Sequence, residues 1–160
     1  MKRPALSLKS RALAWLAQRE HSRSELRRKL LRHVSQQQVE PGDDSALDPA
    51  AVVDPLLDWL QAHRYLSDER FVESRIHVRA ARYGNLRIRQ ELAQHGVALS
   101  DSSAQQLKDS ELGRAQEVWR RKFGGDVAND PAQRARQARF LSARGFSAEV
   151  VRRIIRGAGD

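Results

Sequence analysis

The residue types that most often catalyse reactions or bind metals are few in this chain and do not form a group. Cysteine is absent from the 160 residues, which excludes a disulfide scaffold, a thiolate metal site and a cysteine nucleophile. The five histidines lack the close mutual spacing of a metal site, and we interpret them as surface or helix-end residues: His21, His33, His63, His77 and His95. We therefore expect no cofactor, no metal and no catalytic residue, and we expect that the chain is not an enzyme.

Other patterns that resemble sites have simpler explanations. Asp54 and Asp58 lie four residues apart and could hold a cation, but two surface carboxylates at this spacing are usually solvated. Gly124-Gly125 lacks the following Lys-Ser/Thr of a phosphate-binding loop. Some serines lie where helix caps are needed, which explains them without a nucleophile: Ser22, Ser67, Ser100 and Ser147. The aromatic residues fall on apolar faces and are expected in the core rather than as platforms for nucleic-acid bases: Trp15, Trp59, Trp119, Tyr65 and Phe123.

Basic residues are the remaining candidates for a functional role. The chain has 29 Lys and Arg against 20 Asp and Glu, a net charge of +9. Residues 1–40 carry +7, 41–62 carry −5, 63–99 carry +3, 100–133 carry −1 and 134–160 carry +5. The basic ends suggest a polyanionic partner or an acidic protein surface, and solvated arginine faces are the alternative. The candidates for contact with a partner or with DNA are Arg23, Arg27, Arg28, Lys29, Arg32, Arg75, Arg79, Arg82, Arg87, Arg89, Arg144, Arg152, Arg153 and Arg156.

An all-α fold is expected to position these residues, because the chain is rich in Arg, Ala and Leu and poor in strand-like alternation. The clearest stretch is 65–97. Ser67 or Asp68 can cap a helix, since a short side-chain oxygen satisfies free N–H groups of the first turn. This helix is expected to run to about Tyr83, where Gly84 can adopt the positive φ that ends it. A second helix follows from 85 to 95 and ends at Gly96 in the same way.

The rest of the chain predicts similar units. Ser22 and Glu25 form a capping-box pattern, in which each side chain can reach the other's backbone N–H. Residues 36–48 contain Pro-Gly-Asp-Asp-Ser and predict an insertion loop inside the first unit. Pro55 either bends the helix around it or marks its start. Further helices are expected at about 8–19, 22–34, 48–63, 100–112, 112–123, 130–145 and 147–156.

The predicted helices group into about three tandem three-helix repeats. We place them at residues 1–66, with the insertion loop, and at 67–110 and 111–160. Each repeat contains a helix that ends in a similar Leu-x-x-x pattern, at Leu30, Leu92 and Leu141. One such unit buries little apolar surface, so stacking on its neighbours would supply stability. The predicted architecture is an elongated, curved array, and a compact bundle is the competing possibility.

Three stretches at these spacings carry a resemblance to a known family. They are SRSELRRKL at residues 22–30, YLSDERF at 65–71 with the downstream Tyr83-Gly84, Ile88, Glu91, Leu92 and Gly96-Val97, and FLSARGF at 140–146. In this order they closely resemble the signature of the RecX family, bacterial modulators of the RecA recombinase, over about residues 13–155. Arg75 departs from the family pattern, which often has an aromatic residue near this position.

The resemblance implies a function in regulation by binding, without catalysis. Members of the family bind within the helical groove of the RecA–single-stranded DNA filament, restrain its growth and suppress ATP hydrolysis and strand exchange. The implied setting is recombination, DNA repair and the SOS response. The family supplies no catalytic residue and no cofactor that could be carried over to this chain. The basic residues of the outer faces are then the expected contacts with the RecA filament.

A direct, non-specific DNA-binding helical module is the alternative hypothesis, because three-helix units also describe helix-turn-helix domains. No helix with a cluster of base-reading side chains is evident, which disfavours sequence-specific recognition. Weak binding of single- or double-stranded DNA is compatible with the first hypothesis. The chain has no apolar stretch of about 20 residues and no signal-peptide pattern, so we expect a cytoplasmic bacterial protein that does not bind a membrane. We also expect it to be a monomer.

Overall fold

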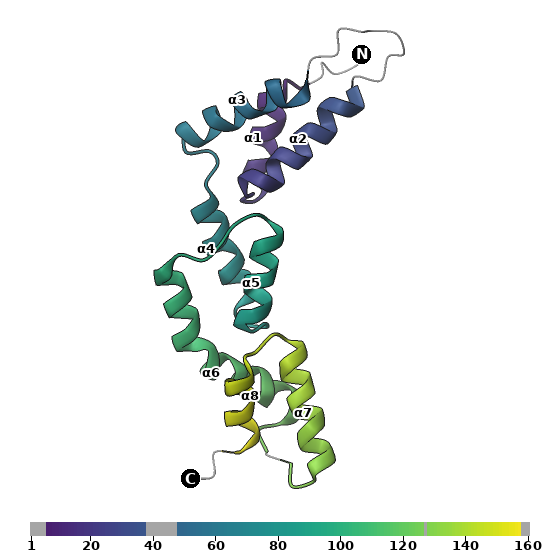
Figure 1. The fold of residues 1–160 in the computed structure, drawn as a ribbon, viewed down its shortest axis with the longest axis vertical. Helices are drawn as coiled ribbons and strands as arrows, with labels where there is room; N and C mark the ends of the chain where they lie inside the picture. Colours follow the sequence, from purple (N-terminus) through teal and green to yellow (C-terminus); the bar gives the residue numbers. More distant parts are fainter. Residues whose placement is uncertain (1–5, 38–47, 127, 158–160) are drawn as a thin grey trace. The chain divides into compact units, whose positions relative to one another are not determined.

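The computed structural model describes residues 6–37, 48–126 and 128–157, and every regular element within them is an α-helix (Figure 1). The all-α prediction is thus confirmed. Most of the predicted insertion loop at 36–48 lies outside the described residues. None of the described helices combines the length and apolar character needed to cross a lipid bilayer. The helices are α1 (Leu8–Gln18), α2 (Arg23–Gln37), α3 (Pro49–Ala62), α4 (Asp68–Arg79), α5 (Asn85–Gln94), α6 (Asp101–Phe123), α7 (Pro131–Ala143) and α8 (Ala148–Ile155).

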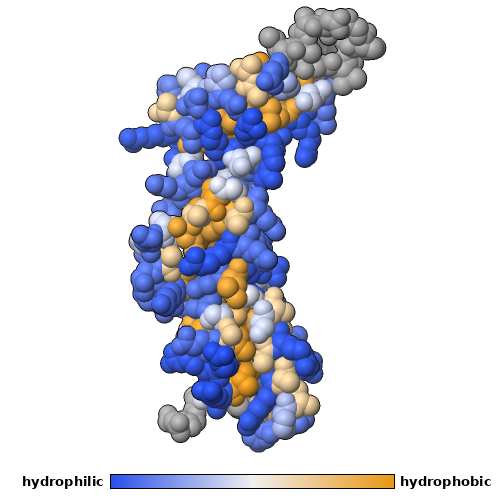
Figure 2. All heavy atoms as spheres, in the orientation of Figure 1, coloured by the Kyte–Doolittle hydropathy of each residue, from blue (hydrophilic) through white to orange (hydrophobic). Residues whose placement is uncertain are grey.

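The chain forms two compact units, which we describe separately. The first unit comprises Met1–Phe71 and His95–Val97, and the second comprises Val72–Gln94 and Ala98–Asp160. Each unit has its own apolar core. Hydrophilic residues cover most of the visible face, and apolar residues form smaller patches on it (Figure 2).

The core of the first unit is made by α1, α2 and α3 and the segment after α3. Its buried residues are Ala12, Leu26, Leu30, Val53, Leu57, Leu60 and Leu66. Asp48 caps α3, because its side chain accepts a hydrogen bond from the N–H of Ala50, and a proline follows as the first helical residue. Pro55 lies inside α3, so Asp54-Pro55 does not mark the start of this helix.

Two side chains accept hydrogen bonds from the first N–H groups of α2, and one of them comes from a distant part of the chain. Ser22 Oγ accepts a hydrogen bond from Glu25 N at 3.1 Å, which is one half of the predicted capping box. The Glu25 carboxylate instead pairs with Arg19, so the reciprocal half was predicted wrongly. The side chain of Asp68 accepts from the N–H of Arg23 at 2.8 Å. Ser67 therefore caps α4, through the N–H of Arg70, while Asp68 satisfies α2.

The core of the second unit is made by α6, α7 and α8. Its buried residues are Ala115, Val118, Trp119, Leu141, Phe146, Val151 and Ile154. The indole N–H of Trp119 donates to Gln137 Oε1 at 3.0 Å, so this buried polar pair is satisfied across α6 and α7. Ser147 caps α8 and Asp130 caps α7, both as predicted.

Helix α6 corrects one prediction. The sequence suggested two helices at 100–112 and 112–123, whereas Asp101–Phe123 is one continuous helix capped by Ser100 and ended by Gly124 at φ 79°. The buried positions of the helix recur at three- to four-residue spacing from Leu107 to Trp119 without a break. Gly113 interrupts nothing, since a single helical glycine costs only about 1 kcal/mol. The proposed repeat boundary at 110/111 falls inside this helix.

Gly84 corrects a second prediction. Helix α4 ends at Arg79 rather than Tyr83, and Gly84 is not among the residues with positive φ. Glycine is required here for a close approach instead. A Cβ atom at Gly84 would collide with the backbone of Gly145 and Phe146, and the Gly84 N–H donates to the carbonyl of Arg144 at 2.8 Å. The turn after α4 thereby packs backbone to backbone on the turn between α7 and α8.

Candidate partner interface

The basic face of α2 is largely neutralised inside the first unit. Arg27 Nε donates to Asp54 Oδ1 at 2.8 Å, and Arg23 forms an ion pair with Asp58 at 2.8 Å. The two aspartates of α3 therefore compensate arginines of α2. Among the described residues no group of three potential ligands is arranged to hold a metal ion. Arg28 and Arg32 keep exposed side chains on the same helix.

Lys29 belongs to the packing of the first unit. Its Nζ donates to Nε2 of His21 at 3.0 Å and lies 4.4 Å from the centre of the Trp15 ring. His21 is buried and lies just before α2, so of the two predicted placements it lies at a helix end and not on the surface. Because Nε2 accepts from Lys29, Nδ1 carries the proton and donates to the Arg19 carbonyl at 3.0 Å. Burial is the main cause that lowers the pKa of His21, and it also lowers the pKa of Lys29.

Tyr65 also differs from its predicted role. Its side chain is 50% exposed and stacks on Trp59, whose other neighbours include His63 at 4.2 Å between ring centres. Trp59 is partly buried against the first core, as predicted. Tyr65 is exposed because it follows the last turn of α3, where the chain leaves the helix.

Three of the candidate arginines surround one aromatic ring in the second unit. The guanidinium carbons of Arg87, Arg144 and Arg79 lie 4.2, 5.4 and 5.5 Å from the centre of the Tyr83 ring. Arg79 and Arg87 share the single carboxylate of Glu91, at 3.1 and 3.7 Å. The predicted stripe of Arg75, Arg79 and Arg82 is interrupted, because α4 ends at Arg79 and Arg82 lies in the turn beyond it.

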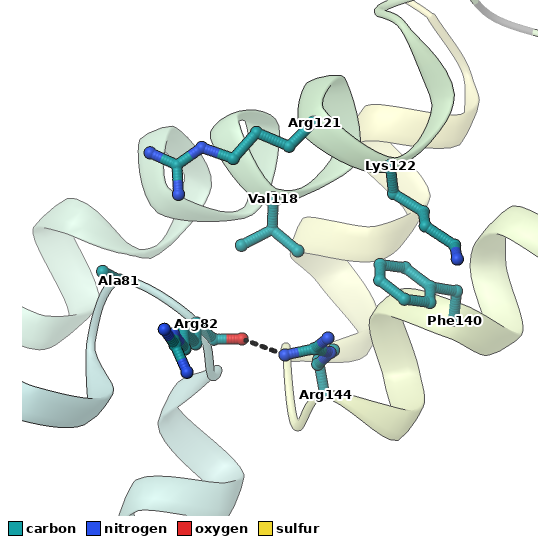
Figure 3. A pocket seen from close by; sticks show the side chains of 7 residues that line it. All are labelled: Ala81, Arg82, Val118, Arg121, Lys122, Phe140 and Arg144. Carbon is teal, nitrogen blue, oxygen red and sulfur yellow. Dashed lines mark hydrogen bonds between the residues drawn. The ribbon is translucent and has the colours of Figure 1, made fainter.

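Four cations gather around a pocket in the same unit. The pocket has a volume of about 280 Å³ and lies between the turn after α4, the C-terminal part of α6 and α7 (Figure 3). Arg144 Nη1 lies 3.5 Å from the carbonyl oxygen of Arg82, across the pocket. The lining residues are Ala81, Arg82, Val118, Arg121, Lys122, Phe140 and Arg144.

Sequence reasoning found Arg82 and Arg144 but missed Arg121 and Lys122. Residues 100–133 have a net charge of −1, which hides the basic run Arg120-Arg121-Lys122 at the end of α6. Three consecutive basic residues were the signal that could have found them. Such residues are also favourable at a helix C-terminus for the dipole alone, so the signal is not specific.

The remaining candidates lie on exposed helix surfaces. Arg152, Arg153 and Arg156 are exposed at α8, whose buried side carries Val151 and Ile154. Arg89 is exposed on α5, beside the buried stripe of Ile88 and Leu92. The structure thus brings Arg79, Arg87 and Arg144 together at Tyr83, and Arg82 and Arg144 together at the pocket, while it leaves the α8 arginines as a separate surface.

Two charged residues that sequence reasoning missed, the half-buried Arg114 and the buried Glu111, hold this part of the second unit. Arg114 donates to the carbonyls of Ala80 and Tyr83 at 3.0 and 2.9 Å, and so satisfies the chain where it leaves α4. Glu111 is 4% exposed and accepts from Asn85 N and Ser147 Oγ at 2.8 and 2.6 Å. One side of α6 therefore fixes the turn that carries Arg82, and also the starts of α5 and α8.

Comparisons with known proteins place these features in a family. Models of the first, second and third three-helix domains of RecX match residues 9–41, 67–101 and 109–155. The regulatory protein RecX of Ralstonia nicotianae is 50% identical over 159 residues, covering 98% of this chain and 91% of the relative. The RecX of Leptothrix cholodnii is 47% identical over 156 residues, covering 96% and 90%.

A crystal structure of RecX from Lactobacillus salivarius shares the fold. It has a TM-score of 0.66 at 15% identity and covers 93% of this chain and 92% of the other. The predicted three-helix organisation is confirmed, and most of α6 lies in the third matched domain, which begins at residue 109. The chain belongs to the RecX family of regulatory proteins.

Proposed function

We propose that this protein binds the RecA–single-stranded DNA filament in its helical groove and inhibits ATP hydrolysis and strand exchange by the recombinase. The observation that carries the proposal is membership of the RecX family over all three domains. The close relatives are named regulatory proteins, which supports an action through binding rather than through catalysis. Such a regulator changes filament stability because it binds one state of the filament more tightly than another.

Exposed arginines are the proposed contacts. At α8, Arg152, Arg153 and Arg156 are exposed and form no ion pair with a carboxylate of the described residues. Arg23 and Arg27 contribute less by this argument, because carboxylates of α3 already compensate them. The α8 surface can therefore bind an acidic partner without first breaking an internal ion pair.

The test is reversal of the three α8 arginines together, as Arg152→Glu, Arg153→Glu and Arg156→Glu. Val151 and Ile154 stay in the core, so α8 should remain helical, which circular dichroism verifies. We expect weaker filament binding and reduced inhibition of the RecA ATPase, with the largest loss at low salt, because exposed charges are screened. Replacement of the same arginines by lysine keeps the charge and serves as the matched control. Normal inhibition by the reversed variant would contradict this assignment of α8.

A further inference from the structure

We propose that the pocket between the turn after α4, α6 and α7 is a subsite for one nucleotide of single-stranded DNA. Backbone phosphates would contact Arg82, Arg121, Lys122 and Arg144, and a base would stack against the ring of Phe140. The proposal deepens the proposed function by naming a DNA contact within the same protein. It stands on the pocket alone, however, and is tested with bare DNA, so its failure and the failure of RecA binding are distinguishable.

The charges of the lining select an anion. Four of the seven lining residues are cationic and none is acidic. Arg82, Arg121 and Lys122 have exposed side chains. This differs from the nearby Arg79 and Arg87, which share the carboxylate of Glu91. Arginine and lysine bind phosphate through charge-assisted hydrogen bonds, and their attraction for DNA comes from the release of condensed counterions.

The aromatic side chain of the pocket suits a nucleobase. Phe140 is partly buried, and the edge-to-face contact with Phe123, at 5.3 Å between ring centres, orients its ring. Arg144 and Lys122 lie 5.3 and 5.7 Å from the centre of the same ring, and Figure 3 shows both side chains beside it. Cations beside an aromatic ring form the usual combination in proteins that bind single strands, where the ring stacks on a base and the cations follow the backbone.

An acidic segment of a protein is the competing occupant. A carboxylate and a phosphodiester each carry one negative charge, and an acidic segment and a DNA strand can both present several in succession, so the cations alone do not decide between them. The ring of Phe140 favours DNA, because a strand places a base beside each phosphate and an acidic segment offers no flat ring to stack on it. Val118 and Phe140 are apolar lining residues of the pocket, and they also suit the flat face of a base. No amide side chain lines the pocket, so it offers no Asn or Gln to read a base edge, and we expect binding without sequence preference.

The first experiment measures the affinity of the whole protein for a fluorescent oligo(dT) by anisotropy at low salt. Lys122→Glu removes one of the pocket cations, and Lys108→Glu makes the same charge change at an exposed position of the same helix. We expect Lys122→Glu to weaken binding by about tenfold and to flatten its salt dependence. Lys108→Glu should have a much smaller effect. Equal effects of the two substitutions would overturn the proposal, because they would report overall charge alone.

The second experiment tests the stacking. Phe140→Leu should weaken binding of oligo(dT) by about fivefold or more, but leave an abasic strand of equal length unaffected. Phe140→Tyr keeps the aromatic ring and should retain most of the oligo(dT) affinity, so the comparison survives if the leucine variant is poorly folded. Equal losses for both strands in a folded Phe140→Leu variant would refute stacking. Binding of poly-glutamate as tight as that of oligo(dT), with the same dependence on Lys122, would assign the pocket to an acidic protein segment and overturn the proposal.

Discussion

At the scale of the residue, glycine serves two different purposes in this protein. Gly96 and Gly145 have φ of 70° and 87°, so these two helix stops were predicted correctly. Gly84 has no positive φ and is needed because the backbone of the α7–α8 turn lies against it. A pattern of Tyr-Gly after a helix does not distinguish the two cases. Only the contact with Gly145 and Phe146, about sixty residues away, does so.

Substitution of Gly84 tests this contact. Gly84→Ala should lower the free energy of unfolding by about 1–3 kcal/mol, because the added Cβ meets backbone atoms that cannot rotate away. Chemical denaturation followed by circular dichroism measures the change. Gly113→Ala is the matched control, since a Cβ at this helical site meets nothing within 4 Å. The control should be neutral or slightly stabilising, by up to about 1 kcal/mol. Equal stability of both variants would contradict the close approach.

His21 gives a prediction on pH. Burial is the main cause that lowers its pKa. The hydrogen bond to the Arg19 carbonyl and the charge of Glu25 raise the pKa, whereas the charges of Arg19 and Lys29 lower it further. The unfolded chain therefore binds a proton at higher pH than the folded chain does. Stability from this site is complete above the ordinary value of 6.5 and is lost as the pH falls from there towards the lowered value. NMR titration should show His21 titrating below 6.5, as the Nδ1–H tautomer. A titration above 6.5 would be inconsistent with the buried contacts.

At the scale of the element, the helices could be predicted where their determinants are local. Ser7, Asp48, Ser100, Asp130 and Ser147 cap helices through neighbouring N–H groups, and most of these caps were recognisable in the sequence. The continuity of α6 was missed because Gly113 and the polar residues around it conceal the buried stripe. The pocket could not be predicted, since it combines a turn, α6 and α7 that are separated by tens of residues.

Glu111 tests how α6 organises its neighbours. Glu111→Ala should cost about 1–3 kcal/mol of stability, because the part-buried N–H of Asn85 loses its acceptor and Ser147 loses a partner. Glu117→Ala is the control on the same helix. Glu117 is exposed and pairs with Arg120, so its loss should change stability by less than about 1 kcal/mol. Thermal denaturation of the two variants compares them, and equal destabilisation would contradict the role of Glu111.

At the scale of the whole molecule, charge decides which candidates remain available to a partner. The acidic segment at 41–62 contributes Asp54 and Asp58 to ion pairs with α2, so part of the N-terminal charge of +7 is compensated internally. Exposed cations remain on α5, α6 and α8 of the second unit. The net charge of +9 is therefore unevenly distributed, and the attraction for an anionic partner differs from one surface to another.

Co-sedimentation of the wild-type protein with RecA–single-stranded DNA filaments, compared with bare single-stranded DNA at the same salt concentration, tests the central proposal most directly. A regulator directed at the filament should bind the filament much more tightly than bare DNA, since RecA contributes contacts that DNA alone lacks. The nucleotide subsite then accounts for the weaker binding to bare DNA. Equal affinity for the filament and for bare DNA would contradict the account and would identify the protein as a DNA-binding module.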